Sequence, residues 1–481
     1  MVSRRSGSRK SVLLILGGVA GFLMLVVLVA PFFIDVDRFK PRLETAASAA
    51  LGMDVLVDGR LRMTLFPIPH VTAEEVRILD ARGVVAMSVK RVGASIDLLR
   101  LFHRELRLRR VELRQPVLTI ERDSEGRLNV AALRKAEALL GTLDGGSVSL
   151  SEGTLHYADL RSGQAIEARD LDLNVSRLRF AGGKSPESWK SVSLQAEVAC
   201  GEIRTKNLVA SAFHVTVVGK DGVLILDPVT LRLFGGQMTG SLRADVSDSI
   251  PDYRLHCSLP GFRIEEFFKT LSPQKAGEGA MDFSATLSTK GVALGQLVGS
   301  AAGQFSLRGR DLTLVGHDLD AELSRFESSQ SFNLVDVGAV FLAGPLGLAV
   351  TKGYNFASLF QGPGGHSDIA TLVSDWRVDS GIAQAKDVAL ATTRNRIALH
   401  GGLDFVHGQF ADVTVATIDA RGCALVRQAI RGPFGKPVVE KPRALQSLAG
   451  PVMKLYRQTR GLFPSGPCEA FYSGSVAAPR P

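Results

Sequence analysis

The amino-acid sequence predicts a mainly β protein, in which an antiparallel sheet has one apolar and one wet face and a few short helices accompany the strands. Three observations predict this class. Apolar and polar residues alternate with period two along much of the chain. Glycine is abundant, with 49 residues, whereas aromatic residues make up 6%, and short strands joined by tight turns have this composition. Long helical patterns, which parallel βαβ units require, are few.

A basic tail and an apolar run open the chain. Residues 1–11 carry three arginines and one lysine without an acid, and residues 12–34 form an uncharged apolar run. At about 1.5 Å per residue, a helix of that length crosses a hydrocarbon core of about 30 Å. A cleaved signal peptide is the alternative, but the run is long and lacks an A-x-A site. We therefore predict a single transmembrane anchor, with the tail in the cytoplasm and the remainder exported.

Short helices are predicted at five places after the anchor. The first begins at Asp37, has Pro41 in its first turn and ends at Gly52, as capping preferences indicate. The other four are indicated only by apolar residues at helical spacing. They cover Ala131–Leu140, Ile264–Leu271, Asp318–Glu327 and Ala444–Arg460.

The remaining chain has the alternation of strands. In Met281–Ser288, four apolar residues share one face and four polar residues share the other. The same pattern predicts strands over Val84–Leu98, Leu171–Val175, Val192–Cys200, Val229–Leu242, Tyr253–Leu259, Gln304–Leu314 and Val388–Val415. Such alternation is typical of antiparallel sheet with one covered face. A sandwich would cover the apolar face, whereas a long curled sheet would leave it as a groove, and the residues alone leave both open.

Chain length limits the domain organisation, and net charge limits the classes of partner that the chain is expected to bind. At 481 residues the chain exceeds what one compact core usually holds, so several domains or one repetitive body are expected. The formal net charge of +9 fits nucleic acid, an anionic lipid surface or no specific partner. Export would remove nucleic acid from reach, so we predict no nucleic-acid partner.

The sequence contains no arrangement of residues that indicates catalysis. The nine histidines show no HxH or HExxH spacing and no CxxC pair occurs, so no metal site is predicted. Gly362–Ser367 is rich in glycine but lacks the Lys-Ser/Thr of a P-loop, and no G-x-S-x-G motif is present. Carboxylates are scattered without an acid–base pair. We expect no catalytic residues, no cofactor and no enzyme activity.

A run of arginines lies in Arg100–Arg114, where it alternates with leucines. The plain interpretation is a strand with a basic wet face. The second is a patch near the membrane that binds anionic headgroups. Its candidate residues are Arg104, Arg107 and Arg109.

The four cysteines are too few for a disulfide scaffold. Disulfides persist in the compartment to which the chain would be exported. We predict that Cys423 and Cys468 form a bridge that ties the tail to the last strands. Cys200 and Cys257 fall on apolar strand faces, which favours buried free thiols, with a bridge between them as the alternative.

A series of short motifs follows the apolar run in a definite order. They are Ile34-Asp35, Asp37–Lys40, Leu51-Gly52, Val57–Leu61, Leu65–Pro67, Leu106–Pro116, Leu118–Ile120, Gly126–Asn129, Gly153–Asp159 and Leu231–Gly240. Their order resembles the AsmA-like family of inner-membrane-anchored envelope proteins of Gram-negative bacteria. The region from Leu307 to about Pro442 resembles the family's C-terminal region, whereas the tail Ala444–Pro481 departs from the common pattern.

The resemblance implies an elongated, curled antiparallel sheet that forms a repeating apolar β-groove and projects from the inner membrane into the periplasm. It implies binding or transfer of phospholipid or another envelope lipid, in support of outer-membrane biogenesis and envelope lipid homeostasis, with envelope proteins as further partners. The alternative is a non-enzymatic assembly or scaffolding factor for outer-membrane proteins. The groove candidates, chosen from the alternation, are Leu255, Phe283, Leu287 and Phe305.

The predicted organisation divides the exported chain into four parts. Residues 35–140 form an N-terminal AsmA-like β region and residues 141–300 a middle β-groove region. Residues 301–442 form a C-terminal AsmA-like β region, and residues 443–481 form a tail with a short helix.

Overall fold

The protein is mainly β, as its sequence predicts. The computed structural model describes residues 36–64, 69–96, 108–130, 143, 145–180, 192–270, 277–316, 318–321, 323, 365–434, 436–440, 443–444, 468 and 470–479. The chain forms two compact units. The first comprises Met1–Lys206 with Phe213–Gly222, and the second comprises Asn207–Ala212 with Val223–Pro481. Strand β9 (Val209–Lys220) contributes residues to both.

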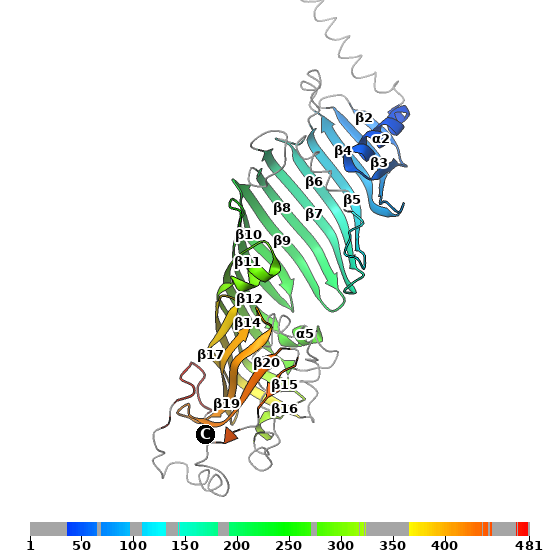
Figure 1. The fold of residues 1–481 in the computed structure, drawn as a ribbon. Coiled ribbons are helices and arrows are strands. Elements are labelled where there is room, and N and C mark those ends of the chain that lie inside the picture. The colour runs from blue at the N-terminus through cyan, green and yellow to red at the C-terminus, as the bar shows by residue number, and fades with distance from the viewer. Residues whose placement is uncertain are drawn as a thin grey trace, which may run out of the picture. The chain divides into compact units, whose positions relative to one another are not determined.

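The first unit consists of a short helical segment followed by a sheet (Figure 1). Its elements are η1 (Val36–Phe39), α2 (Lys40–Leu51), β1 (Asp54–Val57), β2 (Leu61–Thr64), β3 (His70–Leu79), β4 (Val85–Ile96), β5 (Leu108–Arg122), β6 (Ser147–Asp159), β7 (Gln164–Phe180) and β8 (Val192–Thr205). Strands β1 and β2 both pair with β3, and each later strand pairs with the one before it up to β8.

The first predicted helix is present, but Asp37 does not cap it. The N-cap of α2 is Phe39, Pro41 lies in its first turn, and Gly52 ends it in the left-handed conformation. Asp37 lies one turn earlier, in η1. Its carboxylate accepts a hydrogen bond from the backbone N–H of Leu61 at 3.1 Å and pairs with Lys40 at 3.2 Å. The Asp37 side chain therefore ties the helix to β2 instead of satisfying the helix terminus.

The prediction of a purely antiparallel sheet is wrong at one pair. Strands β5 and β6 run parallel, with Arg110 opposite Ser147 and Leu113 opposite Leu150. A parallel pair needs a crossover connection of a dozen or more residues. Residues 123–146 separate the two strands and satisfy this length. Alternation alone does not reveal strand direction, so the sequence analysis missed this pair.

A row of residues with positive φ crosses the sheet of the first unit. Glu75 on β3, Gln115 on β5, Glu152 on β6 and Asp170 on β7 have φ between 48° and 55°. Two of these positions, Glu152 and Asp170, lie at register shifts between β6 and β7, and the Gln115 amide donates to the Glu152 carboxylate at 2.6 Å. Such bulges bend a strand and increase its twist. The aligned bulges therefore account for the curl of this sheet.

The second unit is an antiparallel sheet with two short helices (Figure 1). Its elements are β10 (Val223–Leu233), β11 (Gly236–Asp245), β12 (Asp252–Arg263), α5 (Ile264–Lys269), β13 (Gly277–Glu278), β14 (Ala280–Lys290), α6 (Leu294–Gly299), β15 (Ala302–Val315), β16 (His366–Asp379), β17 (Ile382–Thr392), β18 (Arg396–Asp404), β19 (Gln409–Ile418), β20 (Ala424–Pro433), β21 (Val438–Val439) and β22 (Arg443–Ala444). No pairing among the described residues joins β10 back to β20.

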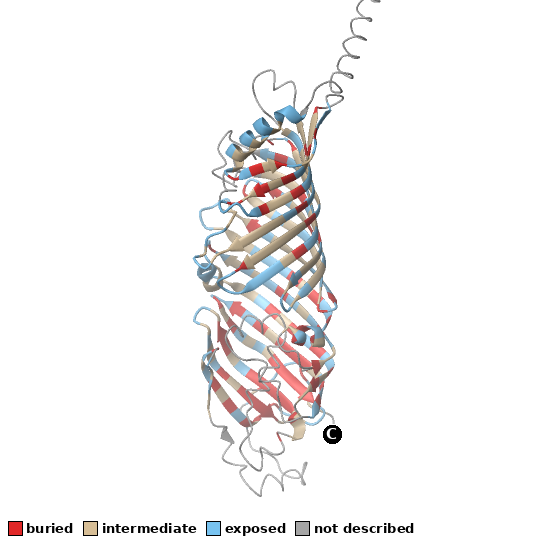
Figure 2. Cartoon of the chain, turned by 90° about the vertical axis from the view of Figure 1, so that its right-hand side faces the viewer, coloured by how far each residue is buried: buried red, intermediate tan, exposed pale blue. Residues whose placement is uncertain are grey.

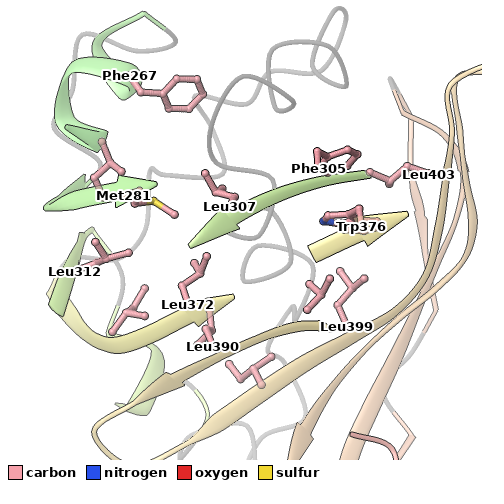
Figure 3. Packing of buried hydrophobic residues seen from close by; sticks show 14 of the residues in the cluster. Phe267, Met281, Phe305, Leu307, Leu312, Leu372, Trp376, Leu390, Leu399 and Leu403 are labelled. Atoms are coloured by element: carbon pink, nitrogen blue, oxygen red, sulfur yellow. The ribbon is translucent and has the colours of Figure 1, made fainter. Parts of the chain in front are cut away.

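The main hydrophobic core lies on one face of this second sheet (Figure 3). Trp376 on β16 stacks on Phe305 of β15, with ring centroids 6.0 Å apart. Phe262 near the end of β12 and Phe267 of α5 are fully buried, as are Leu390 and Ile397. The helix predicted at Ile264–Leu271 is confirmed as α5, and its two phenylalanines close one end of this core.

Parts of β17–β19 are buried on both faces, which differs from the predicted wet face. Buried residues follow one another without a break over Val388–Thr392, Arg396–Leu399 and Val415–Ile418, and Figure 2 shows strands in the lower part of the view on which buried residues predominate. Their second face is floored by Ala389, Ala398 and Ala416. Residues 470–479, here called the C-terminal strap, cover that floor with Tyr472 and Val476. Alanines allow the strap to approach the sheet closely, so an apparently wet face becomes an interior.

Several sequence predictions fall on residues outside the described part. These are the anchor at residues 12–34, the helix at Ala131–Leu140 and most of the helices at Asp318–Glu327 and Ala444–Arg460. Ala444 itself belongs to strand β22. Within the described residues, no helix has both the length and the apolar character that crossing a membrane requires.

Candidate functional site

Rows of apolar side chains cross the strands of the first unit. Directly opposed residues of paired strands project from the same face. One such row is Val92, Leu113, Leu150, Leu173 and Val198, on β4 to β8. All five side chains are only partly buried. This face therefore remains partly accessible over five neighbouring strands.

A matching row crosses the second unit. It runs through Leu226, Leu242, Leu255, Leu287, Gly303, Val378, Ala383, Leu403 and Phe410, on β10 to β19. Exposure falls along it: Leu255 is 37% exposed, whereas Ala383 is fully buried. The apolar face of this unit is thus accessible at β10–β14 and sealed from β16 onwards.

The four groove candidates lie on one face of three neighbouring strands. Leu255 of β12 lies opposite Leu287 of β14, and Phe283 lies opposite Leu259. Phe305 of β15 lies opposite Ala285, two residues from Leu287 on the same face. Phe283 and Leu287 are partly buried, but Phe305 is only 3% exposed because it stacks on Trp376. Phe305 is therefore a core residue in this structure, and whether any of the four contacts lipid stays a prediction.

An open hollow of about 320 Å³ lies where this row is most exposed. Leu242, Leu255 and Leu287 line it together with their neighbours along the strands. Those neighbours include Arg243 and Arg254, which pair with Asp245 at 3.3 Å and Asp252 at 3.5 Å. Because side chains alternate between the two faces of a strand, both arginines project from the face opposite to the three leucines, so the hollow does not mark the apolar face alone. Leu226 and Leu242, which complete the row, were not singled out from the sequence, although their alternation contained the signal.

The predicted headgroup patch is described only in part. Arg104 and Arg107 lie outside the described residues. Arg109 lies on β5 and is exposed. Its neighbour Arg110 is also exposed and pairs with Glu112 at 3.5 Å. The headgroup role of these arginines stays a prediction.

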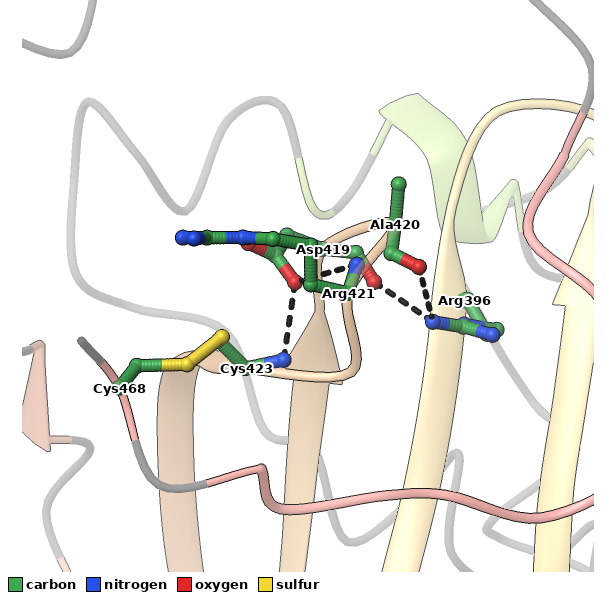
Figure 4. Close-up of a disulfide and its surroundings, with 6 residues drawn as sticks. All are labelled: Arg396, Asp419, Ala420, Arg421, Cys423 and Cys468. Carbon is green, nitrogen blue, oxygen red and sulfur yellow. Dashed lines mark hydrogen bonds and ion pairs between the residues drawn. A yellow bond between two sulfur atoms is a disulfide. The ribbon is translucent and has the colours of Figure 1, made fainter. Parts of the chain in front are cut away.

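The cysteines are arranged as the sequence analysis favours. Cys423 and Cys468 form a disulfide with their Cα atoms 6.1 Å apart (Figure 4). Cys200 and Cys257 are free and buried. Burial raises the pKa of both free thiols. The disulfide joins the start of β20 to the segment that leads into the C-terminal strap.

The C-terminal strap is held by polar groups that sequence reasoning did not identify. The Asp387 carboxylate accepts hydrogen bonds from the Tyr472 hydroxyl and from the Ser475 N–H, the latter at 2.9 Å. The buried Arg396 guanidinium donates to the carbonyl oxygens of Val476 at 2.8 Å and Asp419 at 2.7 Å. The contacts that reach the strap join residues 80 to 88 positions apart, so no local pattern could reveal them. They fasten the strap to the sheet.

Metal binding finds no support in the described part of the chain. No group of three or more His, Cys, Asp or Glu side chains lies there in an arrangement that could hold an ion. The prominent feature of both units is therefore the partly exposed apolar face.

Comparison with protein families agrees with this architecture. The AsmA family model matches residues 10–185 and 183–337, which is more than half of the chain. The chain belongs to the AsmA family. The match ends at residue 337, so the AsmA resemblance suggested for the region up to Pro442 is not covered by it. No curated protein matches the sequence.

The family assignment indicates where such proteins generally occur and what they are generally associated with. AsmA-family proteins are generally membrane-anchored and periplasmic, and they are generally associated with lipids and membranes. A large curled β-sheet with a partly exposed apolar face fits an AsmA protein that binds lipid in a groove.

Proposed function

We propose that this AsmA-family protein binds the acyl chains of phospholipid or another envelope lipid along its apolar sheet face and transfers them. The observation that supports this most directly is the row Leu226–Leu242–Leu255–Leu287, which is continuous across four strands and only partly buried. A monomeric sheet normally covers such a face. An acyl chain would cover it without forming any specific polar contact.

The binding free energy is expected to retain an acyl chain on the sheet while still allowing it to move along the apolar face. Burying one CH₂ group contributes about 0.8 kcal/mol. About ten such groups would stabilise a bound chain by roughly 8 kcal/mol before the entropic cost of ordering it. The contacts are non-directional, so a chain can slide from one row to the next. Leucine and valine rows are suited to this use because they present the same surface at each step.

The accessible face differs between the two units. The first unit presents partly buried rows over β4–β8, whereas the second does so only at β10–β14. From Phe305 onwards the face of the second unit is filled by its own side chains, including Trp376. Under the proposal, lipid therefore binds the second unit only up to Leu255 and Leu287. The strands from β15 onwards do not bind lipid, because their own side chains fill this face.

The cellular role proposed here follows from the family and from the N-terminal sequence. Residues 12–34 would anchor the chain once in the inner membrane, with residues 1–11 in the cytoplasm and the β-sheet in the periplasm. Lipid transfer there would support outer-membrane biogenesis and lipid homeostasis of the envelope. We propose no enzyme activity, since binding and sliding require no chemical step.

The proposal is tested by lipid extraction from the full-length protein. The chain would be purified in nanodiscs with a defined lipid, exchanged into nanodiscs with a second lipid, and analysed for retained first lipid by mass spectrometry. We expect retention in the wild type and its loss in the Leu242→Asp/Leu255→Asp double variant. Ser284→Asp, on the opposite face of β14, is the matched control. A folded wild type that retains no lipid would overturn the proposal and favour the scaffolding alternative.

A further inference from the structure

One rim of the second unit is built from consecutive hairpin turns. The turn between β11 and β12 is joined to the turn after β14 by the Gly291 N–H, which donates to Pro251 at 3.0 Å. The end of α6 is joined to the β16–β17 turn by the Gly381 N–H, which donates to Ala301 at 3.0 Å. The β18–β19 turn follows, with Phe405 N–H donating to Gly381 at 3.1 Å. These hydrogen bonds make one continuous edge.

Aliphatic side chains project from this edge. Leu294 is 77% exposed, Val292 is 74% exposed and Ile250 is 61% exposed. Val406 is also exposed and passes beside Gly381, because a Cβ there would lie 2.7 Å from its Cγ2. We call these four residues the aliphatic rim. At the opposite rim of the same unit, the described turn residues include no exposed large apolar side chain, and Thr393, Arg394 and Arg421 occupy its tips.

The rim is held rigidly in place. The Gln296 side chain accepts hydrogen bonds from the N–H groups of Val292 at 2.9 Å and Ala293 at 3.2 Å. Ser300 bonds to both the N–H and the carbonyl of Lys290, at 2.8 and 2.6 Å. The two most exposed aliphatic residues are therefore presented to solvent by a closed network of polar contacts, not by a loose loop. Such exposure costs solubility and so indicates an occupant.

We infer that the aliphatic rim inserts into the surface of a lipid bilayer. This inference rests on the proposed function and adds the place where lipid would be exchanged. Four aliphatic side chains offer far less than the roughly 1,200 Å² that a stable protein interface buries, and the rim has none of the aromatic or arginine anchors of such interfaces. A bilayer needs neither, because each inserted side chain contributes separately.

The rim is also continuous with the accessible part of the apolar row. Leu287 lies four residues before Gly291, and Leu255 lies four residues after Pro251. Gly303, opposite Leu287, lies two residues after Ala301. A bilayer in contact with the rim would thus lie next to Leu255 and Leu287 of the apolar row. An acyl chain could pass between the two without crossing water.

The charges on the rim indicate how it would bind. Lys290 pairs with Asp252 at 3.3 Å and His407 with Asp404 at 2.7 Å, and Asp248 and Asp379 add two acidic groups, so the described edge carries no excess of positive charge. Binding should therefore depend on insertion of apolar side chains and hardly on anionic lipid or salt. This separates the rim from a basic patch, whose binding would fall steeply with ionic strength.

The test uses the full chain in nanodiscs, so that the N-terminal segment already has a membrane. The loaded nanodiscs are mixed with phosphatidylcholine vesicles, and the fraction that floats with the vesicles is measured. We expect flotation that changes less than twofold between 50 and 500 mM salt. Val292→Asp/Leu294→Asp should lower it at least fivefold, and Leu160→Asp, a 65% exposed leucine in the first unit, should leave it unchanged.

Several results would overturn the inference. These are flotation equal in the rim variant and the wild type, flotation lost in high salt, or no flotation at all. Self-association that disappears in the rim variant, without flotation, would assign the rim to a second copy. Lipid retention is measured in parallel. A rim variant that retains lipid but no longer floats supports the rim as a separate site, whereas a wild type that floats but retains no lipid refutes the proposed function alone.

Discussion

The Tyr472 hydroxyl donates a hydrogen bond to the Asp387 carboxylate and so fastens the C-terminal strap to β17. Burial and the neighbouring carboxylate raise the pKa of Tyr472, which keeps the phenol protonated as a donor. The same hydroxyl accepts a hydrogen bond from the Val476 N–H at 3.0 Å. One side chain therefore joins the strap to the sheet and also fixes the fold of the strap.

Replacing Asp387 by Asn should loosen the strap. The amide keeps the shape but turns one acceptor into a donor that faces the Ser475 N–H and hydroxyl. The expected loss is about 1–3 kcal/mol of local stability. It would be measured as faster hydrogen exchange in residues 470–479, with Asp379→Asn, on the exposed end of β16, as the control. Unchanged exchange would show that Asp387 does not hold the strap.

The strap should also loosen in acid. Burial raises the pKa of Asp387, but hydrogen bonds from Ser475 and Tyr472 outweigh it and leave the pKa below the usual 3.8. A depressed folded pKa contributes stability that is present above the unfolded value and is lost as pH falls through the folded value. We expect constant protection of residues 470–479 from pH 8 to 5 and a loss below pH 3.8, after correction for intrinsic exchange. The Asp387→Asn variant should lack this transition.

Reduction of the disulfide should destabilise the second unit. The bridge spans 45 residues, for which the loop-entropy relation predicts a stabilisation of at most about 4 kcal/mol. Thermal unfolding with and without a reductant should show a lower midpoint when the bridge is reduced. The Cys423→Ser/Cys468→Ser variant provides the control, because the reductant should not affect it. A reductant effect that persists in that variant would contradict the prediction.

The two free cysteines should resist modification. Cys200 and Cys257 are buried, and burial raises their pKa, so little thiolate is available. A thiol reagent should modify neither residue in the folded protein and both after unfolding in urea. Rapid reaction at either cysteine under native conditions would show that its strand opens, and mass spectrometry would identify the strand.

At the positive-φ positions of the first unit, the effect of a substitution on stability should depend on whether the new residue tolerates that backbone conformation. Glu152 has a φ of 55°, which glycine adopts freely and a β-branched residue does not. Glu152→Val should cost about 1–2 kcal/mol, whereas Glu152→Gly should be nearly neutral. The midpoint of urea unfolding is the measurement. Glu197→Val, at an exposed position of β8 without positive φ, should have little effect. Equal losses of stability in Glu152→Val and Glu152→Gly would show that the positive φ at this position does not determine the effect of substitution.

The strands could be predicted from the sequence because their faces are chemically distinct. The alternation in Met281–Ser288 and Tyr253–Leu259 corresponds to β14 and β12, and the apolar residues share one face. The turn at Phe234-Gly235, where Gly235 has a φ of 75°, falls inside the predicted strand range Val229–Leu242, which the structure divides between β10 and β11. Period two is a local property, so a single sequence contains it.

Other features depend on contacts between distant residues and were not predictable. The parallel pairing of β5 with β6 depends on the path of the connection, and alternation is the same for either direction. Phe305 has the pattern of a groove residue, but Trp376 of β16 covers it. The alanine floor under the strap has too little apolar surface to be noticed in sequence. In each case a distant segment decides the burial.

The claim that lipid lies on the apolar row is tested most directly by photocrosslinking. A photoreactive amino acid would be placed singly at Leu255, at Leu150 of the first unit and at Ser284 on the opposite face, in the full chain in its native membrane. The account predicts lipid adducts at Leu255 and Leu150 and none at Ser284. Adducts at all three positions alike, or protein adducts alone at Leu255 and Leu150, would contradict it.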